Sequence, residues 1–240
     1  KRLCAEQDIQ CDEFDLSFAS PANSWRRLVS TIRQLSGRPA SYIVDITTMP
    51  RETIWTIFWL LRDGNARVEY VYHTPEEYGS WLSRDPAKPR LVYKLSGEAR
   101  LGVSTALVVL TGFDIDRVQQ LMRFFEPDLT LLGLQPGDRF ASQKRNADRH
   151  RECYGSEPSI RLFEIDSYQS DHGYGAIAQR VGKVCNDHDV ILASLGPKLS
   201  AVALFKIHEA WCNTALAYAP SREFNREYSR GVGDSIWGTL

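Results

Sequence analysis

Short runs of β-branched and other apolar residues alternate with longer segments of helical pattern along most of this chain. The run 106–110 reads Ala-Leu-Val-Val-Leu, without the polar alternation that marks a strand with one face in water. Such an unbroken apolar run is typical of a strand covered on both faces. Strands separated by helical patterns of 10–15 residues predict βαβ units and a parallel sheet. We therefore expect an α/β protein.

The strands that this pattern predicts are 11–18, 42–46, 67–72, 91–95, 106–110, 129–134, 160–165, 190–193 and 215–218. The predicted helices are 24–35, 51–62, 115–125, 142–153, 175–186 and 199–211. Crossover connections between parallel strands are right-handed. The expected fold is consequently a Rossmann-like, mostly parallel sheet with helices on both faces.

The stretch 74–100 interrupts this alternation, because it is rich in proline and glycine and holds only the short predicted strand 91–95. A chain of 240 residues is within the size of one domain. We expect a single Rossmann-like domain over 1–240. Its two βαβ halves would be 1–73 and 101–240, joined by the excursion 74–100.

The charge balance weakens the case for two classes of partner. The 29 Lys and Arg residues are offset by 30 Asp and Glu residues, so bulk attraction to nucleic acid or to an anionic membrane is not expected. The basic segment 144–151 could meet a phosphate chain, but a charged run is usually a solvated helix face. No apolar run reaches the ~20 residues that a membrane helix needs.

The five cysteines are scattered, with no Cys-x-x-Cys pair and no spacing typical of metal ligands. This usage predicts reduced thiols and a cytoplasmic location. We expect neither a metal site nor a cofactor.

The turn after the strand 190–193 is the strongest candidate for a ligand site. In open parallel sheets, ligands bind beyond the carboxyl ends of the strands. Gly196 allows a ligand to approach the backbone closely, Lys198 adds a positive charge, and Ser194 and Ser200 add hydroxyl groups. The helix that follows offers free N–H groups and a positive dipole end. These features suit a phosphate or a carboxylate; the alternative is a capped turn with Lys198 in solvent.

Two other turns follow the same logic. Thr47, Thr48 and Arg51 bring hydroxyl groups and a cation to the start of a helix; the alternative is a helix cap with a local ion pair between Asp45 and Arg51. Thr111 and Gly112 form the third turn. In it, Asp114 is expected to cap the next helix rather than to serve as an acid.

An enzyme acting on a nucleotide or a sugar phosphate is the alternative function, with Asp45, Asp114 or His172 as acid or base. A short dinucleotide-like match is formally present at Gly173-x-Gly175-x-x-Ala178. His172 is expected in a solvent-exposed loop. The chain lacks the Gly-x-Ser-x-Gly, Walker A and His-Glu-x-x-His patterns, which argues against the common hydrolase, kinase and zinc-enzyme templates.

The segment 190–220 resembles the C-terminal ligand-binding unit of CARF-type sensor domains. That unit has a strand, a Gly-Thr-Lys-like turn, an apolar helix and a strand with an aromatic end; here the turn reads Leu-Gly-Pro-Lys-Leu-Ser over 195–200. The resemblance implies a cyclic oligonucleotide ligand, a homodimer and a role in prokaryotic defence. It also implies that Gly196, Lys198 and Ser200 line a pocket that Thr47 and Thr48 face from the N-terminal half.

The leading hypothesis from the sequence is a binding or sensor module for a nucleotide or another phosphorylated ligand. A second alternative to it is a protein-interaction scaffold, with the six tryptophans mainly in core and interface. The Arg- and Gly-containing segment 222–233 could fold over the carboxyl edge of the sheet as a lid, or form a plain surface extension.

Overall fold

The computed structural model describes residues 6–7, 11–17, 19–35, 41–62, 66–79, 81–140 and 142–240. The chain divides into two compact units, Lys1–Arg38 and Pro39–Leu240, which are considered separately. None of the helices in the described ranges is long and apolar enough to cross a membrane.

The first unit contains the helix α2 (Pro21–Leu35). It begins three residues before the expected start at Ser24, because proline at a first helical position loses no intrahelical hydrogen bond. Residues 11–17 form no strand, so the strand expected over 11–18 is wrong there; Phe18 lies outside the described residues. The alternating apolar and polar residues of 14–17 resemble a strand pattern, but no strand among the described residues pairs with them.

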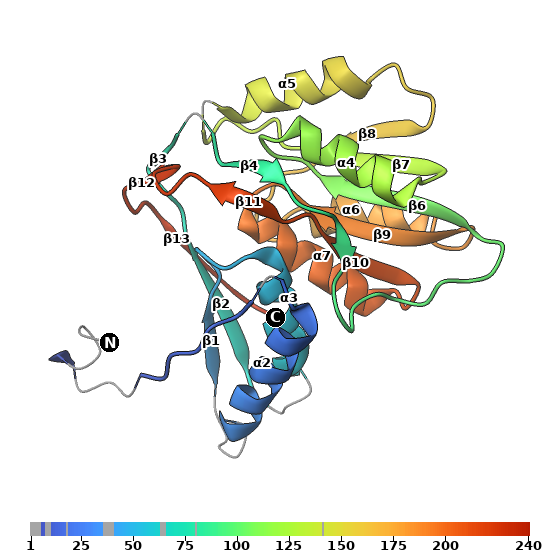
Figure 1. Ribbon diagram of the computed structural model, residues 1–240. Coiled ribbons are helices and arrows are strands. Elements are labelled where there is room, and N and C mark those ends of the chain that lie inside the picture. Colours follow the sequence, from blue (N-terminus) through green and yellow to red (C-terminus); the bar gives the residue numbers. More distant parts are fainter. Residues whose placement is uncertain are drawn as a thin grey trace. The chain divides into compact units, whose positions relative to one another are not determined.

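The second unit is built around a six-stranded sheet with the order β5-β10-β9-β6-β7-β8 (Figure 1). Five of these strands are parallel, and β5 pairs with β10 in the antiparallel sense at one edge. The strands are β5 (Arg90–Leu91), β6 (Ser104–Leu110), β7 (Leu129–Leu134), β8 (Ile160–Glu164), β9 (His188–Ser194) and β10 (Thr214–Tyr218). The α/β class predicted from the alternating pattern is confirmed.

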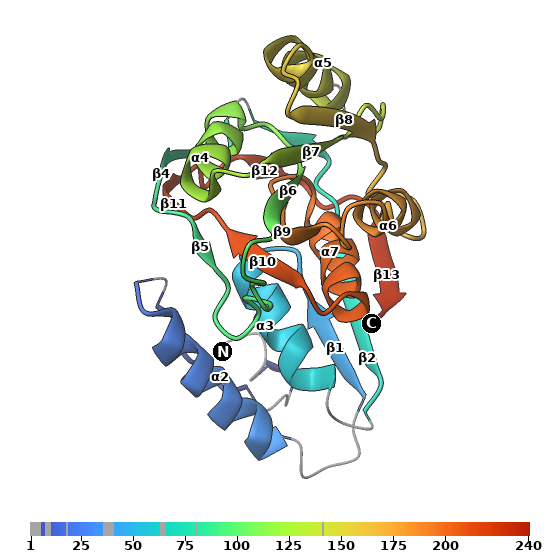
Figure 2. The ribbon, with the colours of Figure 1, turned by 90° about the vertical axis from the view of Figure 1, so that its right-hand side faces the viewer.

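Helices cover both faces of this sheet, which explains its unbroken apolar strands. Helices α4 (Ile115–Phe125) and α5 (Ser142–Tyr154) lie on one face, and α6 (Tyr174–Gly182) and α7 (Lys198–Ala210) lie on the other (Figure 2). All six residues of β7 are buried, as expected for a strand between two helical layers.

The chain reverses its direction of travel across the sheet between β6 and β9. From the central strand β6 it proceeds outward to β7 and β8, and then returns through α6 to β9 on the other side of β6. The helices after β6 and β9 therefore diverge to opposite faces. Such a switch point leaves a crevice at the carboxyl ends of the two strands.

A second, three-stranded sheet has the order β1-β2-β13. Strands β1 (Tyr42–Asp45) and β2 (Val68–His73) are parallel and are joined by α3 (Arg51–Arg62), while β13 (Ser235–Thr239) runs antiparallel to β2. Helix α3 packs on α7, where the indole Nε1 of Trp55 donates to the carbonyl of Ala201 over 2.8 Å. The expected strands near 42–46 and 67–72 thus exist and pair with each other, and β2 also pairs with the C-terminal strand β13.

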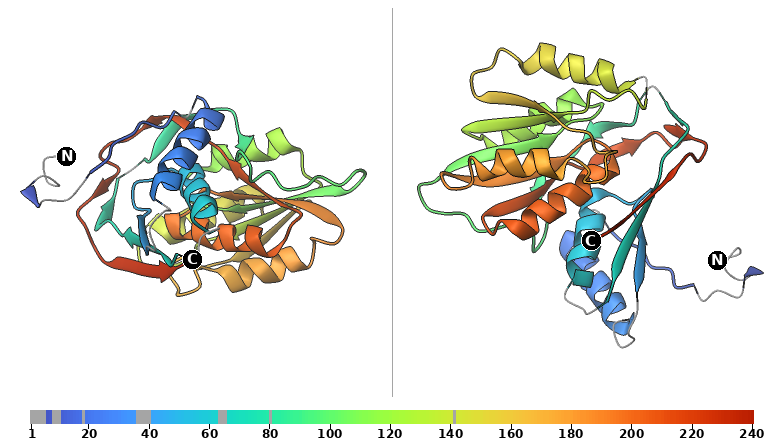
Figure 3. Two further views of the ribbon diagram at one scale, coloured as in Figure 1. Left: turned by 90° about the horizontal axis from the view of Figure 1, so that it is seen from below. Right: turned by 180° about the vertical axis from the view of Figure 1, so that it is seen from behind.

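The excursion 74–100 pairs with the C-terminal segment in two short ribbons. Strand β3 (Glu77–Tyr78) pairs with β12 (Ser229–Arg230), and β4 (Ser83–Pro86) pairs with β11 (Ser221–Phe224). The segment then continues into β13 beside β2 (Figure 3). The strand expected over 91–95 is reduced to β5, because residues 93–94 form a turn.

Candidate functional site

A pocket of about 350 Å³ lies at the carboxyl ends of β6 and β9, at the switch point of the six-stranded sheet. The turns after these two strands touch through their backbones. A Cβ on Gly112 would overlap the carbonyl of Leu195, and one on Gly196 would lie 2.8 Å from the carbonyl oxygen of Thr111. Only glycine allows this approach at either position. His150 supports the first turn from α5, since its Nε2 lies 3.0 Å from the Gly112 carbonyl.

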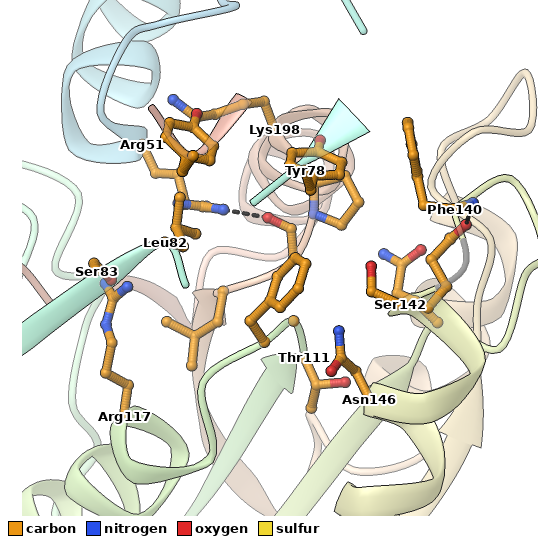
Figure 4. Close-up of a pocket in the computed structure, with 18 of the residues that line it drawn as sticks. Arg51, Tyr78, Leu82, Ser83, Thr111, Arg117, Phe140, Ser142, Asn146 and Lys198 are labelled. Atoms are coloured by element: carbon orange, nitrogen blue, oxygen red, sulfur yellow. Dashed lines mark hydrogen bonds between the residues drawn. The ribbon is translucent and has the colours of Figure 1, made fainter. Parts of the chain in front are cut away.

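Two cations, the buried Arg51 and the half-buried Lys198, begin two helices at this pocket (Figure 4). Arg51 is the first residue of α3, and Lys198 is the first residue of α7. The Arg51 guanidinium donates from Nε to the Ser194 hydroxyl over 3.0 Å and from Nη2 to the Gly196 carbonyl. The Lys198 ammonium donates to the Met49 carbonyl. Within the part of the chain that the structure describes, neither forms an ion pair with a carboxylate.

The electrostatics of this pair are unfavourable without a ligand. Burial, with a smaller effect of the positive charge of Arg51, lowers the pKa of Lys198 from 10.5 to about 7. Burial, with a smaller effect of Arg117, lowers the pKa of Arg51 from 12.5 to about 10. Both shifts have the same physical origin, because a charge removed from water needs a partner of opposite sign. An anion bound between the two groups would supply it.

A third cation, Arg117 of α4, lies in the same wall but has a carboxylate near it. Its guanidinium donates to the Ala219 carbonyl, and its Nε lies 3.9 Å from a carboxylate oxygen of Asp114. Asp114 also accepts from the Arg117 backbone N–H over 3.0 Å as the N-cap of α4. The expected capping role of Asp114 is confirmed.

Aromatic rings form much of the remaining wall. Tyr78 is at their centre: its ring centroid lies 4.8 Å from that of Phe140, 5.9 Å from that of Phe113 and 6.2 Å from that of Tyr228. Its hydroxyl lies 3.1 Å from that of Tyr72. The sequence analysis missed these residues, because they come from β2, β3 and three separate loops. Aromatic clusters in the excursion and the C-terminal segment were the available signal.

The full lining combines these groups with amides and hydroxyls, and among the described residues it contains no Asp, Glu or His. The lining residues other than those named above are Thr48, Pro50, Leu82, Ser83, Gln135, Ser142, Gln143, Asn146, Ala147, Tyr168, Pro197, Tyr218, Phe224, Asn225 and Arg226. Four lining residues belong to the C-terminal segment: Phe224, Asn225, Arg226 and Tyr228. The segment 222–233 therefore contributes to the wall, in agreement with the lid rather than the plain extension.

The structure brings most of the predicted ligand-binding residues together. Those that line the pocket are Thr48, Arg51, Thr111, Gly112, Gly196 and Lys198. Because Lys198 is half-buried in the wall and its ammonium donates to the Met49 carbonyl, the alternative that placed it in solvent is wrong. The alternative ion pair between Asp45 and Arg51 is also absent from the described ion pairs, since Arg51 turns to the β9 turn instead.

Three predicted residues lie behind the wall. Ser194 and Ser200 are buried, with their hydroxyl oxygens 2.7 Å apart, and Ser200 also donates to the Pro197 carbonyl. They support Arg51 and the turn rather than face the pocket. Thr47 accepts through its hydroxyl from the His73 backbone N–H over 2.9 Å, which ties the β1 turn to the end of β2.

The suggested acid and base residues are outside the pocket lining. His172 is buried, so its expected exposure in a loop was wrong. Its Nε2 lies 2.6 Å from the Tyr70 hydroxyl, its Nδ1 lies 3.0 Å from the Ser167 carbonyl, and burial lowers its pKa. The Asp45 carboxylate accepts from the Thr47 N–H over 2.9 Å.

The glycine motif before α6 is already occupied by a side chain. The Asp171 carboxylate accepts from the N–H groups of Gly173 and Gly175, each over 2.9 Å. It holds the position that a phosphate would take at a helix N-terminus. The Gly173-x-Gly175-x-x-Ala178 match is therefore a self-capped turn.

Neither the cysteines nor the acidic and histidine residues form a metal centre in the described ranges, where no cluster of three such residues could hold an ion. Cys11, Cys153, Cys185 and Cys212 are free thiols, and Cys4 lies outside the described residues. In the basic helix α5, Arg151 is paired with Asp148 and Glu164. No protein-family model matches the chain, and no curated protein matches its sequence.

Proposed function

We propose that the unit 39–240 is a Rossmann-like module that binds a phosphorylated ligand of the nucleotide class at the carboxyl ends of its parallel strands. The observation that carries this proposal is the pair of cations in the pocket wall, the buried Arg51 and the half-buried Lys198, which have no carboxylate partner among the described residues. A phosphate group between them would neutralise charge that the fold keeps out of water.

The topology supports this assignment. The parallel strands have the order β10-β9-β6-β7-β8, which is the 3-2-1-4-5 order of doubly wound nucleotide-binding sheets when they are numbered along the chain. In such sheets the ligand lies at the switch point, between the first and fourth strands. These are β6 and β9, where the pocket lies.

The helix that begins at Lys198 adds a second contribution. No side chain caps its N-terminus, since the N-cap position is Pro197 and makes no side-chain hydrogen bond there. The first N–H groups of a helix have no intrahelical acceptor, and the helix dipole favours an anion at this end. A phosphate group here would accept hydrogen bonds from the free backbone N–H groups and from the Lys198 ammonium.

The lining also favours binding over turnover. Hydrolytic and transfer chemistry usually needs a carboxylate or an imidazole within hydrogen-bond reach of the substrate, and the described lining has neither. A scaffold would have no concave site at the strand ends, whereas this unit has a pocket there. The resemblance to CARF-type sensors further points to a cyclic oligonucleotide, a homodimer and a defence role for this module.

Binding calorimetry and thermal unfolding test the proposal. The probes are inorganic pyrophosphate, mononucleotides, cyclic dinucleotides and sugar phosphates, with Lys198→Met as the test variant and Lys183→Met, at an exposed position, as its matched control. A ligand at 100 times its Kd should add about 2.7 kcal/mol to the free energy of unfolding.

The wild-type protein and the Lys183→Met variant should show this shift, and Lys198→Met should lose it. Chromatography of the ligand after incubation should recover it unchanged. Recovery of a cleaved or transferred product would instead support an enzyme. No binding by any phosphorylated probe would overturn the proposal.

A further inference from the structure

We propose that Asn146 determines which ligand the pocket accepts, by pairing with a planar base that presents an amino donor beside a ring-nitrogen acceptor. This inference rests on the proposed function, since it assigns the part of the ligand that extends beyond the phosphate. The chemical class is a 6-aminopurine nucleotide, as opposed to a sugar phosphate or a 6-ketopurine nucleotide.

Asn146 is a buried amide without a partner. The residue is only 7% exposed, and its side chain makes no hydrogen bond to any described residue. None of the polar atoms of its side chain is both fully enclosed by protein and unpaired. The amide therefore faces open space, and Figure 4 shows it pointing from α5 into the pocket beside Thr111.

The other three amides of the pocket are engaged by the protein. Asn225 donates to the Trp81 carbonyl over 3.0 Å and accepts from the Glu227 backbone N–H over 3.1 Å. Gln135 donates to the Ser167 hydroxyl and accepts from the Ser167 backbone N–H. Gln143 accepts from the Phe140 backbone N–H over 2.9 Å. A buried amide that is left unpaired destabilises a fold, so the unpaired state of Asn146 is explained if a ligand completes it.

The surroundings of Asn146 suit a flat ring. Ala147 follows it in the lining, and its small side chain leaves room. The edge-on cluster of Tyr78, Phe113 and Phe140 forms an aromatic wall of the same pocket, and aromatic faces stack on bases of any kind.

The amide chemistry then selects among bases. An Asn side chain donates through its NH₂ and accepts through its C=O, and it pairs bidentately with an amino group next to a ring-nitrogen acceptor, as on adenine. On the purine edge that carries N7, where we place this pair, a keto group in place of the amino group presents two acceptors side by side. One of them would face the Asn146 carbonyl oxygen without a proton between them.

Calorimetry with matched adenosine and inosine nucleotides tests this inference, using the 5′-monophosphates and the cyclic dinucleotides, with inorganic pyrophosphate as the probe of the cation pair alone. Adenosine and inosine differ by the amino-to-keto change and have nearly the same size. The wild-type protein should bind the adenosine form at least about tenfold more tightly. The variant Asn146→Leu should reduce this ratio to near one and bind pyrophosphate as the wild type does.

The outcomes separate the two proposals. If no phosphorylated probe binds the wild-type protein, the proposed function fails and this inference falls with it. If adenosine and inosine nucleotides bind equally well to the wild-type protein, the role of Asn146 is overturned while the proposed function stands. This comparison needs no variant.

The unfolding midpoint of ligand-free Asn146→Leu supplies a second readout. Removal of an unpaired amide should leave it unchanged or raise it. A lower midpoint, together with an unaltered adenosine-to-inosine ratio, would show that Asn146 supports the fold only.

Discussion

The guanidinium of Arg51 reaches across 143 positions of the chain to donate from its Nε to the hydroxyl of Ser194, over 3.0 Å. This bond joins the start of α3, from the three-stranded sheet, to the end of β9 in the six-stranded sheet. Arg51 thereby links the two sheets at the floor of the pocket, with its planar group held by Ser194 and by the Gly196 carbonyl.

Replacement of Arg51 by lysine should be costly, although it keeps the charge. A single ammonium cannot reproduce the fork that serves the Ser194 hydroxyl and the Gly196 carbonyl. We expect Arg51→Lys to lower the free energy of unfolding by about 1–3 kcal/mol and to weaken pyrophosphate binding at least about tenfold. Urea denaturation and calorimetry measure the two effects.

Arg67→Lys is the matched control, since Arg67 pairs with Glu69 at an exposed position. It should change stability by less than about 1 kcal/mol. Equal effects of the two substitutions would contradict the joining role of Arg51.

The contact between the β6 and β9 turns makes Gly112 intolerant of a side chain. A Cβ there would overlap the Leu195 carbonyl, and a backbone atom cannot rotate away as a flexible side chain does. Gly112→Ala should cost about 3 kcal/mol, seen as a fall of roughly 6–12 °C in Tm for a protein of this size.

Gly182→Ala serves as the comparison, because a Cβ at Gly182, the last residue of α6, would have no neighbour within 4 Å. That variant should be unchanged or stabilised by up to about 1 kcal/mol. A tolerated Gly112→Ala would mean that the two turns are not in contact.

The lowered pKa of Lys198 predicts a rise in stability with pH. Between about 7, the pKa in the folded protein, and 10.5, the ordinary value, the unfolded chain binds a proton that the folded protein does not. The free energy of unfolding should therefore increase with pH across this window, with a slope that approaches about 1.4 kcal/mol per pH unit from this group. Urea denaturation of wild type and Lys198→Met at pH 7, 8 and 9 measures the two free energies of unfolding. The difference between them should shrink as the pH rises, because the burial penalty of the Lys198 charge is then relieved in the wild type.

The same lowered pKa of Lys198 predicts the opposite pH trend for ligand affinity. A bound phosphate stabilises the protonated ammonium, so pyrophosphate affinity should fall from pH 7 to pH 9 in the wild-type protein. Lys198→Met should lose this dependence. A flat affinity profile in the wild-type protein would show that Lys198 does not contact the anion.

The lowered pKa of His172 predicts that the protein loses stability in acid. Burial lowers its pKa from 6.5, so below pH 6.5 the unfolded chain takes up a proton that the folded protein excludes. The free energy of unfolding should decrease as the pH falls through this range, and His172→Asn should decrease less steeply. Asparagine is the chosen replacement because residue 172 has a φ of 54°, a left-handed conformation that asparagine tolerates.

The pH comparison should be made at several points between pH 4.5 and pH 7 by urea denaturation. His150 and His208 also have pKa values lowered by burial, so part of the acid sensitivity should remain in the variant. Identical slopes for the two proteins would indicate that His172 is charged in the folded state.

The local elements of this protein could be predicted from short stretches of its sequence. Strands such as 129–134 and helices such as 51–62 and 115–125 are recovered with the predicted bounds, because apolar periodicity, proline at a helix start and an Asp N-cap act over a few neighbouring residues. The three strand-to-helix turns were identified for the same reason, and Arg51, Gly112, Gly196 and Lys198 all lie in the pocket.

The contacts between distant segments, in contrast, are set by the packing of the whole chain and could not be predicted from local patterns. The pairing of β13 with β2, the ribbons over the pocket, the aromatic group around Tyr78 and the unpaired amide of Asn146 all depend on residues far apart in the chain. A pairing register between distant strands leaves no periodic trace in either segment. Burial is likewise a property of the packed chain, which is why the exposure of His172 and Lys198 was decided by their neighbours in space.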